Sequence, residues 1–351
     1  LTRRLQNGKI PEDIRAQLEE MLDHYGNLPI IVRSSSIMED GYGNAFSGKY
    51  ESVFCMNQGT REERLKELED AIRRVYASVM NESAIEYRRK RHLLDMDEQM
   101  ALLIQQVSGQ TYGDYYLPVA AGMGCSYNPY KWMEYLNPRA GMLRMVVGLG
   151  TRAVERTPGD YPRLVGLDRS QANLRTTLAD RHKYSQRQVD VLDFQNKQLC
   201  TKKLDEIIDL LPKWQKKLVL SRDTEAEDML AERHVYKKVY FADCQGIVDN
   251  HEFISMMYSM LQMLESKYEC PVDVEFAITC PEENTWKLNL LQCRPLQSAA
   301  SEQVHIPTGV DDNLLFDVRQ TTMRRSKTEL IDYIVWLDPR KYYEYPYAKK
   351  T

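Results

Sequence analysis

Hydrophobic and polar residues alternate along residues 271–279, and a Leu-rich run follows over residues 286–293. Alternation with a period of two is typical of a strand with one buried face, because successive side chains point to opposite faces. Residues 281–284, Pro-Glu-Glu-Asn, lie between the two segments and have the chemistry of a turn. The pattern therefore predicts a β-hairpin over residues 271–297.

Polar side chains gather on one face of this hairpin. Asp273 and Glu275 share a face of the first strand, and Gln292 and Arg294 share a face of the second, before Pro295 ends the pairing. Carboxylate and amide oxygens are hard ligands of the kind that Mg²⁺ takes together with phosphate oxygens, and an arginine beside them can fork onto a phosphate. The patch favours a site for a metal-bound nucleotide. An ordinary half-exposed hairpin with surface charges is the alternative.

A second candidate segment lies near the start of the chain. Residues 28–32, Leu-Pro-Ile-Ile-Val, predict a short apolar strand that runs into a Ser/Gly-rich stretch ending at Gly48. A buried strand that feeds such a loop can present backbone N–H groups and hydroxyls, among them that of Ser34, to a phosphate. Arg33 at the strand end would add a charge-assisted contact. A mobile surface loop is the alternative.

The rest of the pattern predicts an α/β (α+β) fold in which mixed and antiparallel sheets are flanked by helices. Helical spacing and capping signals predict helices over residues 11–25, from Thr60 past Arg74, over 82–94 and over 251–267. Apolar runs predict strands over residues 50–56, 100–107, 116–125, 142–147 and 164–167, of which the second ends polar at Gln105. The Gly148-Leu149-Gly150 run predicts a tight turn.

Two further regions complete the predicted organisation. Residues 168–243 are polar and mostly helical in spacing, so we expect an inserted helical region there. Residues 298–302, Ser-Ala-Ala-Ser-Glu, have the composition of a linker. We expect residues 298–351 to hold this linker and the start of a further module, with a strand-like segment over residues 314–318. The main unit is then residues 1–297.

Composition narrows the classes of protein. Hydrophobic residues make up 43% and charged residues 28% of the 351, and the net charge of −4 argues against a dedicated nucleic-acid binder. The run Arg88-Arg89-Lys90-Arg91 favours a solvated helix face over a nucleic-acid site, because no aromatic or glycine pattern accompanies it. No apolar run approaches a membrane span, and no signal peptide is visible. We expect no nucleic-acid and no membrane partner.

The cysteines indicate a compartment. Seven cysteines are scattered along the chain without CxxC pairs, and their number is odd. This usage favours free thiols in a reducing cytosol over a disulfide framework, so we expect a cytoplasmic protein. The first residue is leucine, and we expect the chain to be a piece excised from a longer protein.

Two stretches together resemble one enzyme family. Residues 32–36 (Val-Arg-Ser-Ser-Ser), with Glu39-Asp40 and Phe46-Ser47-Gly48, resemble the VRSS…ED…F-[AS]-G signature of the nucleotide-binding domain of phosphoenolpyruvate synthase and pyruvate phosphate dikinase. Residues 273–277 and 291–295 resemble the D-[IV]-E-[WF]-A…[LV]-Q-x-R-P ending of that domain. Three intermediate pieces fit in order, at residues 84–88, 100–105 and 148–150, so the resemblance extends from Leu28 to Gln297.

The resemblance implies an ATP-grasp fold, in which two α/β lobes hold ATP and Mg²⁺ between them. It implies that Arg33 contacts the nucleotide phosphates, that Glu275 and Gln292 ligate Mg²⁺ with Asp273 close by, and that Arg294 supports the phosphate end. Ser34 and Gln105 belong to the matched segments and are expected to contact the nucleotide. The family transfers a phosphoryl group from ATP to a histidine on a separate domain and then to pyruvate on another. Catalysis would rest on positioning and electrostatic stabilisation.

The sequence also departs from the family pattern. Thr151 stands where the family's GLGE turn has its glutamate, and no glycine-rich GGK segment precedes Leu28, where only Lys9 is upstream. The pyruvate-binding barrel is absent, and no histidine lies in a Gly/Ser/Thr-rich phosphoacceptor context. The histidines are His24, His92, His182, His234, His251 and His305. We therefore expect a truncated nucleotide-binding region that is inactive, or binds nucleotide weakly, without the phosphohistidine and pyruvate-binding domains of the full-length chain.

Two alternatives to a dikinase fragment stay open. A related enzyme could carry the same domain and phosphorylate a different final acceptor, because nothing in the sequence names the acceptor. A regulatory or scaffolding module could retain the fold without turnover, which the Thr151 departure favours. The second alternative is opposed by the retention of Arg33, Asp273, Glu275, Gln292 and Arg294, because buried carboxylates without their cation would cost stability.

Overall fold

The computed structural model describes residues 2–36, 38, 48–90, 92–130, 136–154, 157–172, 177–296, 315, 330–338 and 341. The chain separates into two compact units, Leu1–Ser298 and Ala299–Thr351, and the helices and strands given below belong to the first. Residues 39–47 of the predicted phosphate loop and the predicted strand at 314–318 lie outside the described residues, apart from Leu315.

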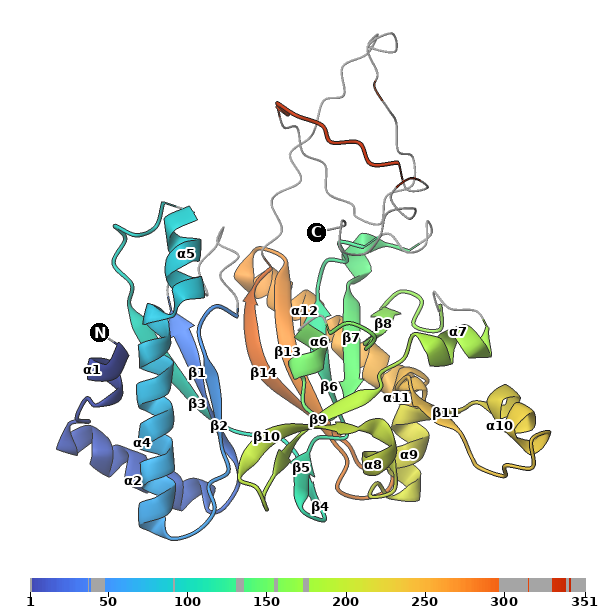
Figure 1. Ribbon diagram of the computed structural model, residues 1–351, viewed down its shortest axis with the longest axis horizontal. Coiled ribbons are helices and arrows are strands. Elements are labelled where there is room, and N and C mark those ends of the chain that lie inside the picture. The colour runs from blue at the N-terminus through green and yellow to red at the C-terminus, as the bar shows by residue number, and fades with distance from the viewer. Residues whose placement is uncertain are drawn as a thin grey trace. The chain divides into compact units, whose positions relative to one another are not determined.

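An N-terminal antiparallel sheet of order β2-β1-β3 is formed by Ser52–Cys55, Ile30–Ser36 and Met100–Gln106. Alternation along β1 turns Ile30 and Val32 into a core with Leu22 of α2 and Leu68 of α4, all of which are fully buried. The helices of this part are α1 (Thr2–Gln6), α2 (Glu12–Tyr25), α4 (Arg61–Ala77), the 3₁₀ turn η1 (Ser78–Met80) and α5 (Glu82–Lys90). Figure 1 shows α4 lying along this sheet.

Helix α4 begins where the sequence predicts, directly after Thr60. The Thr60 Oγ1 accepts from the Glu63 N–H at 3.3 Å, and Glu63 Oε2 accepts from the Thr60 N–H at 2.8 Å. This reciprocal pair satisfies two N–H groups that a helix start otherwise leaves without a partner. The cap therefore explains why the helix starts here.

We expect the Thr60→Ala substitution to lower the free energy of unfolding by about 1 kcal/mol, because the hydroxyl acceptor of this cap is lost. Urea unfolding followed by circular dichroism would measure the change. Thr60→Ser keeps the acceptor and serves as the matched control. Equal unfolding midpoints for the Ala and Ser variants would show that the cap contributes nothing.

The sequence predicts a solvated helix face for the run from Arg88 to Arg91; Arg91 lies outside the described residues, and the other three form such a face only in part. Arg88 is buried, with 8% of its surface exposed, and donates to the Val79 carbonyl at 2.7 Å, so the prediction is wrong for this residue. Lys90 is exposed and pairs with Glu86 at 2.7 Å. Helix α5 ends at Lys90 and not at Leu94 as predicted. Arg88 thus links α5 to η1.

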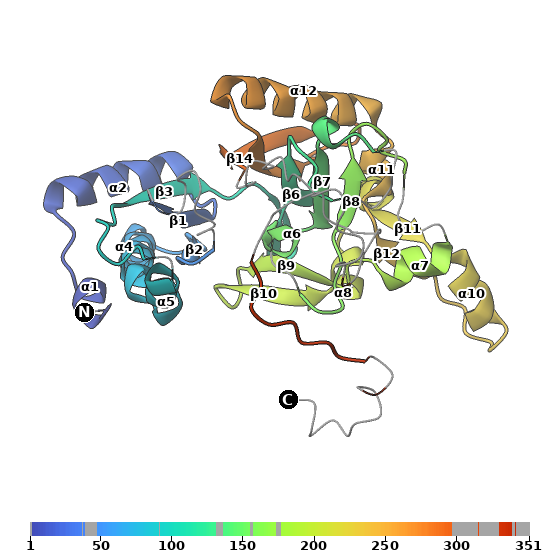
Figure 2. The ribbon, with the colours of Figure 1, turned by 90° about the horizontal axis from the view of Figure 1, so that it is seen from above.

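The predicted hairpin is confirmed as β13 (Val272–Thr279) and β14 (Lys287–Pro295). They form one edge of an antiparallel sheet of order β14-β13-β6-β7-β8. The other strands are β6 (Ala120–Cys125), β7 (Met142–Val147) and β8 (Arg163–Gly166). Helix α12 (His251–Tyr268) lies across one face of this sheet (Figure 2), where Phe253 and Leu261 pack with Val274 and Phe276.

A third antiparallel sheet has the order β10-β9-β5-β4 and contains Gln198–Lys203, Gln188–Asp193, Tyr115–Leu117 and Gln110–Tyr112. The single strand predicted over residues 116–125 is therefore two strands, β5 and β6, in two sheets. Pro118 lies between them, where a residue without an N–H donor cannot continue the ladder. The chain changes sheets at this point.

The prediction of a mostly helical insertion over residues 168–243 is wrong in part. Helices α7 (Leu178–Lys183), α8 (Leu204–Ile208), α9 (Lys213–Val219) and α10 (Thr224–Ala231) lie there, but so do β9, β10 and the pair β11 (Leu220–Arg222) and β12 (Tyr240–Ala242). Val189 and Val191 of β9 are fully buried in the core. The polar residues that alternate with them, Gln188 and Asp190, form hydrogen bonds with side chains that are distant in the sequence. Composition alone does not reveal such partners.

Three short elements complete the described fold. They are the 3₁₀ turn η2 (Pro138–Ala140), α6 (Thr151–Val154) and α11 (Gln245–Val248). Within the described residues, no helix is both long enough and apolar enough to cross a membrane. The expected α/β architecture, with antiparallel sheets flanked by helices, is confirmed.

All seven cysteines are described, and all are free thiols. Burial raises the pKa of Cys55 and of Cys125 from the ordinary 9.0 to about 12, and the nearby Asp273 carboxylate adds to this effect at Cys125. These two thiols therefore stay protonated at neutral pH and are poor nucleophiles.

We expect the free energy of unfolding to fall as the pH rises above 9. In the unfolded chain these thiols ionise from about pH 9 upward, whereas in the folded chain they stay protonated up to about pH 12, so alkaline solution favours unfolding. At about pH 10 the two thiols together would cost about 3 kcal/mol. Urea titrations across this range would measure the loss. Cys125→Ala should remove about 1.4 kcal/mol of the loss at about pH 10, and an unchanged pH slope in that variant would contradict the assignment.

Candidate functional site

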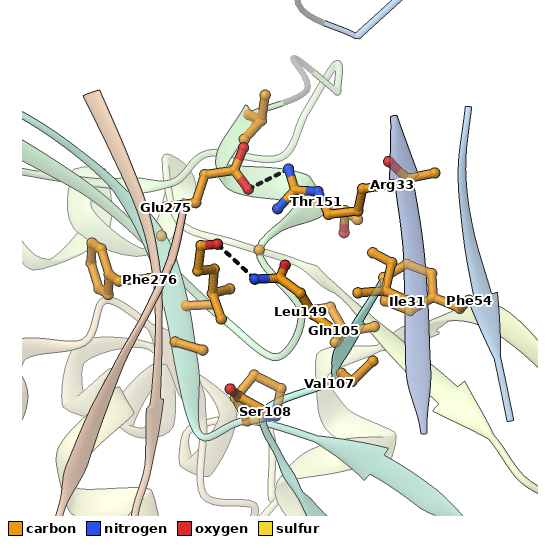
Figure 3. Close-up of a pocket in the computed structure, with 18 of the residues that line it drawn as sticks. Ile31, Arg33, Phe54, Gln105, Val107, Ser108, Leu149, Thr151, Glu275 and Phe276 are labelled. Carbon is orange, nitrogen blue, oxygen red and sulfur yellow. Dashed lines mark hydrogen bonds and ion pairs between the residues drawn. The ribbon is translucent and has the colours of Figure 1, made fainter. Parts of the chain in front are cut away.

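A cavity of about 560 Å³ lies between the β2-β1-β3 sheet and the β13–β14 edge of the five-stranded sheet (Figure 3). Its volume is within the range of pockets that bind small molecules and cofactors. The lining changes in character along its length. Figure 3 places Arg33, Thr151 and Glu275 toward one end and Val107 and Ser108 toward the other.

Strand β1 supplies the first charged side chain of the cavity. Because side chains alternate along a strand, Ile31 and Arg33 face the cavity while Ile30, Val32 and Ser34 face the core under α4. Ser34 is 8% exposed and does not line the cavity. The structure therefore brings Arg33 to the site and does not bring Ser34, because the two are adjacent in a strand and cannot share a face.

Arg33 meets the hairpin across the cavity. Its Nη2 lies 2.7 Å from Glu275 Oε2 and donates to Gln292 Oε1 at 2.8 Å. Glu275 and Gln292 are direct neighbours in the β13–β14 ladder, which explains why a single nitrogen reaches both. The Arg33 and Glu275 side chains are 16% and 20% exposed, so the pair is partly shielded from water. The Arg33 guanidinium thus links two sheets whose strands lie far apart in the sequence.

Asp273 and Arg294 pair two positions further along the same ladder, on the same face as Glu275 and Gln292. Arg294 Nε lies 3.5 Å from Asp273 Oδ1, and its Nη2 lies 3.6 Å from Glu275 Oε1. Glu275 therefore sits between two guanidinium groups, which compensate its charge. The four polar residues predicted to share a face of the hairpin do so in the structure.

A β-bulge sets the position of this cluster. Glu275 pairs with Gln292, but Phe276 pairs with Leu290, so Leu291 is an extra residue of β14. The Leu291 carbonyl accepts a hydrogen bond from Gln105 Nε2 at 3.0 Å (Figure 3). The predicted site residue Gln105 thus lies at the cavity and ties β3 to the hairpin at its irregular point.

The remainder of the lining is largely apolar. Ile31 and Phe54 come from the N-terminal sheet, and Val107, Leu149 and Leu291 close the cavity. Figure 3 shows Ile31, Phe54 and Val107 on one wall, whereas the Phe276 ring points away from the cavity, toward Phe253 of α12. Apolar walls beside a few convergent polar groups suit a ligand that carries both a flat ring and charged groups.

Thr151 belongs to a polar cluster that no local sequence pattern predicts. Its Oγ1 donates to Asp190 Oδ2 at 2.6 Å, and Asp190 Oδ1 accepts from Arg152 Nε at 2.9 Å and from Thr201 Oγ1 at 2.6 Å. Arg152 also pairs with Asp160 at 2.5 Å. These residues come from three separate parts of the chain, so no local spacing could have revealed them. Thr151 itself lines the cavity.

The turn before Thr151 requires glycine. Gly148 has a φ of +82°, and a Cβ there would lie 2.4 Å from Val189 Cγ1 and 2.9 Å from the Asp190 carbonyl. A larger residue would be strained and would push β9 away. The tight turn predicted for residues 148–150 is confirmed, and it places Thr151 within reach of Asp190.

The site offers only part of the oxygen ligands that a hard divalent cation needs. Glu275 and Gln292 present a carboxylate and an amide oxygen side by side, which suits Mg²⁺ held chiefly by phosphate oxygens and water. Within the described part of the chain, no group of three or more His, Cys, Asp or Glu side chains is arranged to hold a metal by itself. A cation here would therefore need a ligand that brings its own oxygens.

The chain matches one protein-family model, described as the AMP/ATP-binding domain of pyruvate phosphate dikinase, over residues 1–313. The match includes every helix and strand described above and the whole lining of the cavity. No curated protein matches the chain.

Proposed function

Because the chain belongs to the family of the pyruvate phosphate dikinase AMP/ATP-binding domain, we propose that its cavity binds Mg²⁺-ATP for phosphoryl transfer. The fold is ATP-grasp-like, and the family is one of ATP-dependent, kinase-like enzymes. The proposed reaction of the longer protein passes the phosphoryl group to a histidine on another domain and then to pyruvate. The observation that carries this proposal is the meeting of Arg33 with Glu275 and Gln292 across the cavity.

Each side chain has a role in this proposal. Arg33 would exchange its contact with Glu275 for the nucleotide phosphates, since a guanidinium forks onto phosphate as readily as onto carboxylate. Glu275 and Gln292 would hold Mg²⁺, with Asp273 next to them, and Arg294 would keep the carboxylates compensated and support the phosphate end. Bound Mg²⁺ would neutralise charge on the phosphate oxygens. The chain's own work would be to position the phosphates and shield them from water.

The apolar end of the cavity would take the adenine ring. Ile31, Phe54 and Leu149 provide apolar surfaces against which a flat ring can pack. Gln105 at this level has its amide nitrogen committed to Leu291, which leaves its carbonyl oxygen as a hydrogen-bond acceptor for the nucleotide. ATP thus has a separate place for its base and for its phosphates.

The phosphoryl acceptor would come from elsewhere. The histidines of the described residues, at positions 24, 92, 182, 234 and 251, do not line the cavity, and no lysine of that part of the chain lines it either. Arg33 and Arg294 are the cations that this part brings to the phosphates. We therefore propose that the chain by itself binds Mg²⁺-ATP weakly and turns over nothing.

Calorimetric titration with Mg²⁺-ATP tests this proposal, with the Glu275→Ala/Gln292→Ala double variant beside the unchanged chain. Binding that the double variant loses would support nucleotide binding at the hairpin. Equal binding by both proteins would overturn it. If neither binds, the same pair should be titrated in the full-length protein, where the same comparison decides.

A second candidate function is a regulatory module that binds nucleotide without turnover. Thr151 favours it, because its hydroxyl is committed to Asp190 where the family carries a glutamate near the nucleotide. Incubating the full-length protein with ATP labelled at the β and γ phosphates distinguishes the two. Label transferred to a histidine supports the enzyme, and nucleotide bound without transfer supports the regulatory module.

A further inference from the structure

A second cavity, of about 790 Å³, is lined by residues of α8, α9, β10 and β12. Five cations line it, against the two carboxylates of Asp205 and Asp209. They come from four places along the chain: Arg187, Lys203, Lys216 and the neighbours Lys237 and Lys238. The excess of positive charge contrasts with the net charge of −4 of the whole chain. The two cavities have no described lining residue in common.

Arg187 is fixed at this cavity by neutral acceptors. Its Nη1 lies 3.0 Å from His182 Nε2, and its Nη2 donates to the His182 carbonyl at 2.9 Å. Since a guanidinium can only donate, Nε2 must accept, and the ring proton is on Nδ1. Nδ1 then donates to Asp223 Oδ2 at 2.6 Å. The imidazole thus holds Arg187 in place without cancelling its charge.

The lysines are poorly compensated too. Lys237 lies 3.7 Å from Asp205, but both side chains are exposed, so this pair contributes little. Among the described residues, no carboxylate lies within 4.0 Å of the charged groups of Arg187, Lys203 or Lys216. Converging like charges repel one another, and an anion bound among them would relieve that repulsion.

The floor of the cavity adds a chemical preference. Leu204, Ile208 and Val239 line it together with Tyr240, and these side chains can pack against carbon atoms. We propose that this cavity is a binding site for a small organic phosphate, whose phosphate group Arg187, Lys203 and Lys216 bind and whose carbon skeleton lies on the apolar floor. The ligand is a phosphate ester by class, and its site is separate from the one proposed for Mg²⁺-ATP.

The chain offers a matched pair of charge deletions for the test. Lys203 and Lys216 line the cavity, whereas their sequence neighbours Lys202 and Lys217 do not. Lys202 lies on the other face of β10, with its Nζ 5.1 Å from the centre of the Tyr115 ring. The variants K203Q/K216Q and K202Q/K217Q therefore remove the same charge from the same two elements.

Inorganic pyrophosphate is the probe, titrated calorimetrically at low ionic strength. The titrations use an Arg33→Met background, so that the first cavity does not contribute. We expect K203Q/K216Q to weaken binding about tenfold or more relative to K202Q/K217Q, since two charge-assisted contacts are lost. Thermal unfolding of each variant checks that the fold is kept.

Two outcomes would overturn the proposal. If both double variants lost the same affinity for pyrophosphate, the effect would come from net charge and not from this cavity. If the Arg33→Met protein bound no pyrophosphate at all, this cavity would bind no phosphate. Because that background removes a residue proposed to bind ATP, failure here is distinguishable from failure of the nucleotide site.

Discussion

Replacing Arg33 with methionine is expected to raise the dissociation constant for Mg²⁺-ATP about 100-fold. Charge-assisted hydrogen bonds contribute roughly 1.5–3 kcal/mol each. A bidentate phosphate contact consists of two such bonds, so at about 1.5 kcal/mol each its loss costs about 3 kcal/mol, or roughly 100-fold in affinity. Methionine keeps much of the side chain's apolar bulk, so the cavity stays filled. Calorimetric titration, in the full-length protein if the isolated chain binds too weakly, would measure the change.

Two control variants accompany this prediction: one keeps the positive charge at position 33, and the other removes an arginine outside the cavity. Arg33→Lys keeps the charge but loses the fork, and we expect about a tenfold loss. Arg61→Met removes an exposed arginine that pairs with Asp23 and Glu19 and does not line the cavity, so binding should not change. If Arg33→Met bound as tightly as Arg61→Met does, Arg33 would have no part in phosphate binding. Glu275 keeps Arg294 at 3.6 Å in the variant, so its charge stays partly compensated.

Replacing Asp190 with alanine is expected to lower the free energy of unfolding by about 3–5 kcal/mol. Three side chains donate to this carboxylate, and it is only 12% exposed. Its removal leaves Arg152, which is 10% exposed, with Asp160 as its remaining carboxylate partner. Urea unfolding would measure the loss. Thr151 would also lose its fixed orientation at the cavity wall.

The matched control for Asp190 is Asp70→Ala. Asp70 also pairs with an arginine, Arg73, but is 57% exposed, and we expect a loss below about 1 kcal/mol there. Asp190→Asn keeps the size and one acceptor oxygen and should fall between the two. Similar losses for Asp190→Ala and Asp70→Ala would show that the buried cluster is not a source of stability.

The sequence was sufficient for the elements whose side chains follow one clear period. The hairpin over residues 272–295, the capped helix after Thr60 and the helix from His251 are all where their patterns predict them. The common face of Asp273, Glu275, Gln292 and Arg294 follows from the same alternation. Pairing across a short turn fixes such a face, so no information beyond the local sequence is needed.

The errors have physical causes as well. The resemblance predicts Ser34 at the site because it follows Arg33 in the matched segment, but strand alternation turns it toward the core. Residues 188–203 have the polar composition of an exposed helical insertion because their buried polar side chains find partners across the fold. Asp190, for example, binds Thr151 and Arg152. Periodicity describes one segment at a time. It cannot detect that a charged residue is buried against partners 38 or 39 positions away.

The extra residue in β14 couples the hairpin to the N-terminal sheet. Glu275 and Phe276 are consecutive in β13, whereas Leu291 separates their partners Gln292 and Leu290. Deleting Leu291 would let both strands alternate regularly and would keep Gln292 opposite Glu275, but it would remove the carbonyl that accepts from Gln105 Nε2. A strand shortened by this one residue should therefore keep its polar face and lose one of the hydrogen bonds that hold the two sheets together.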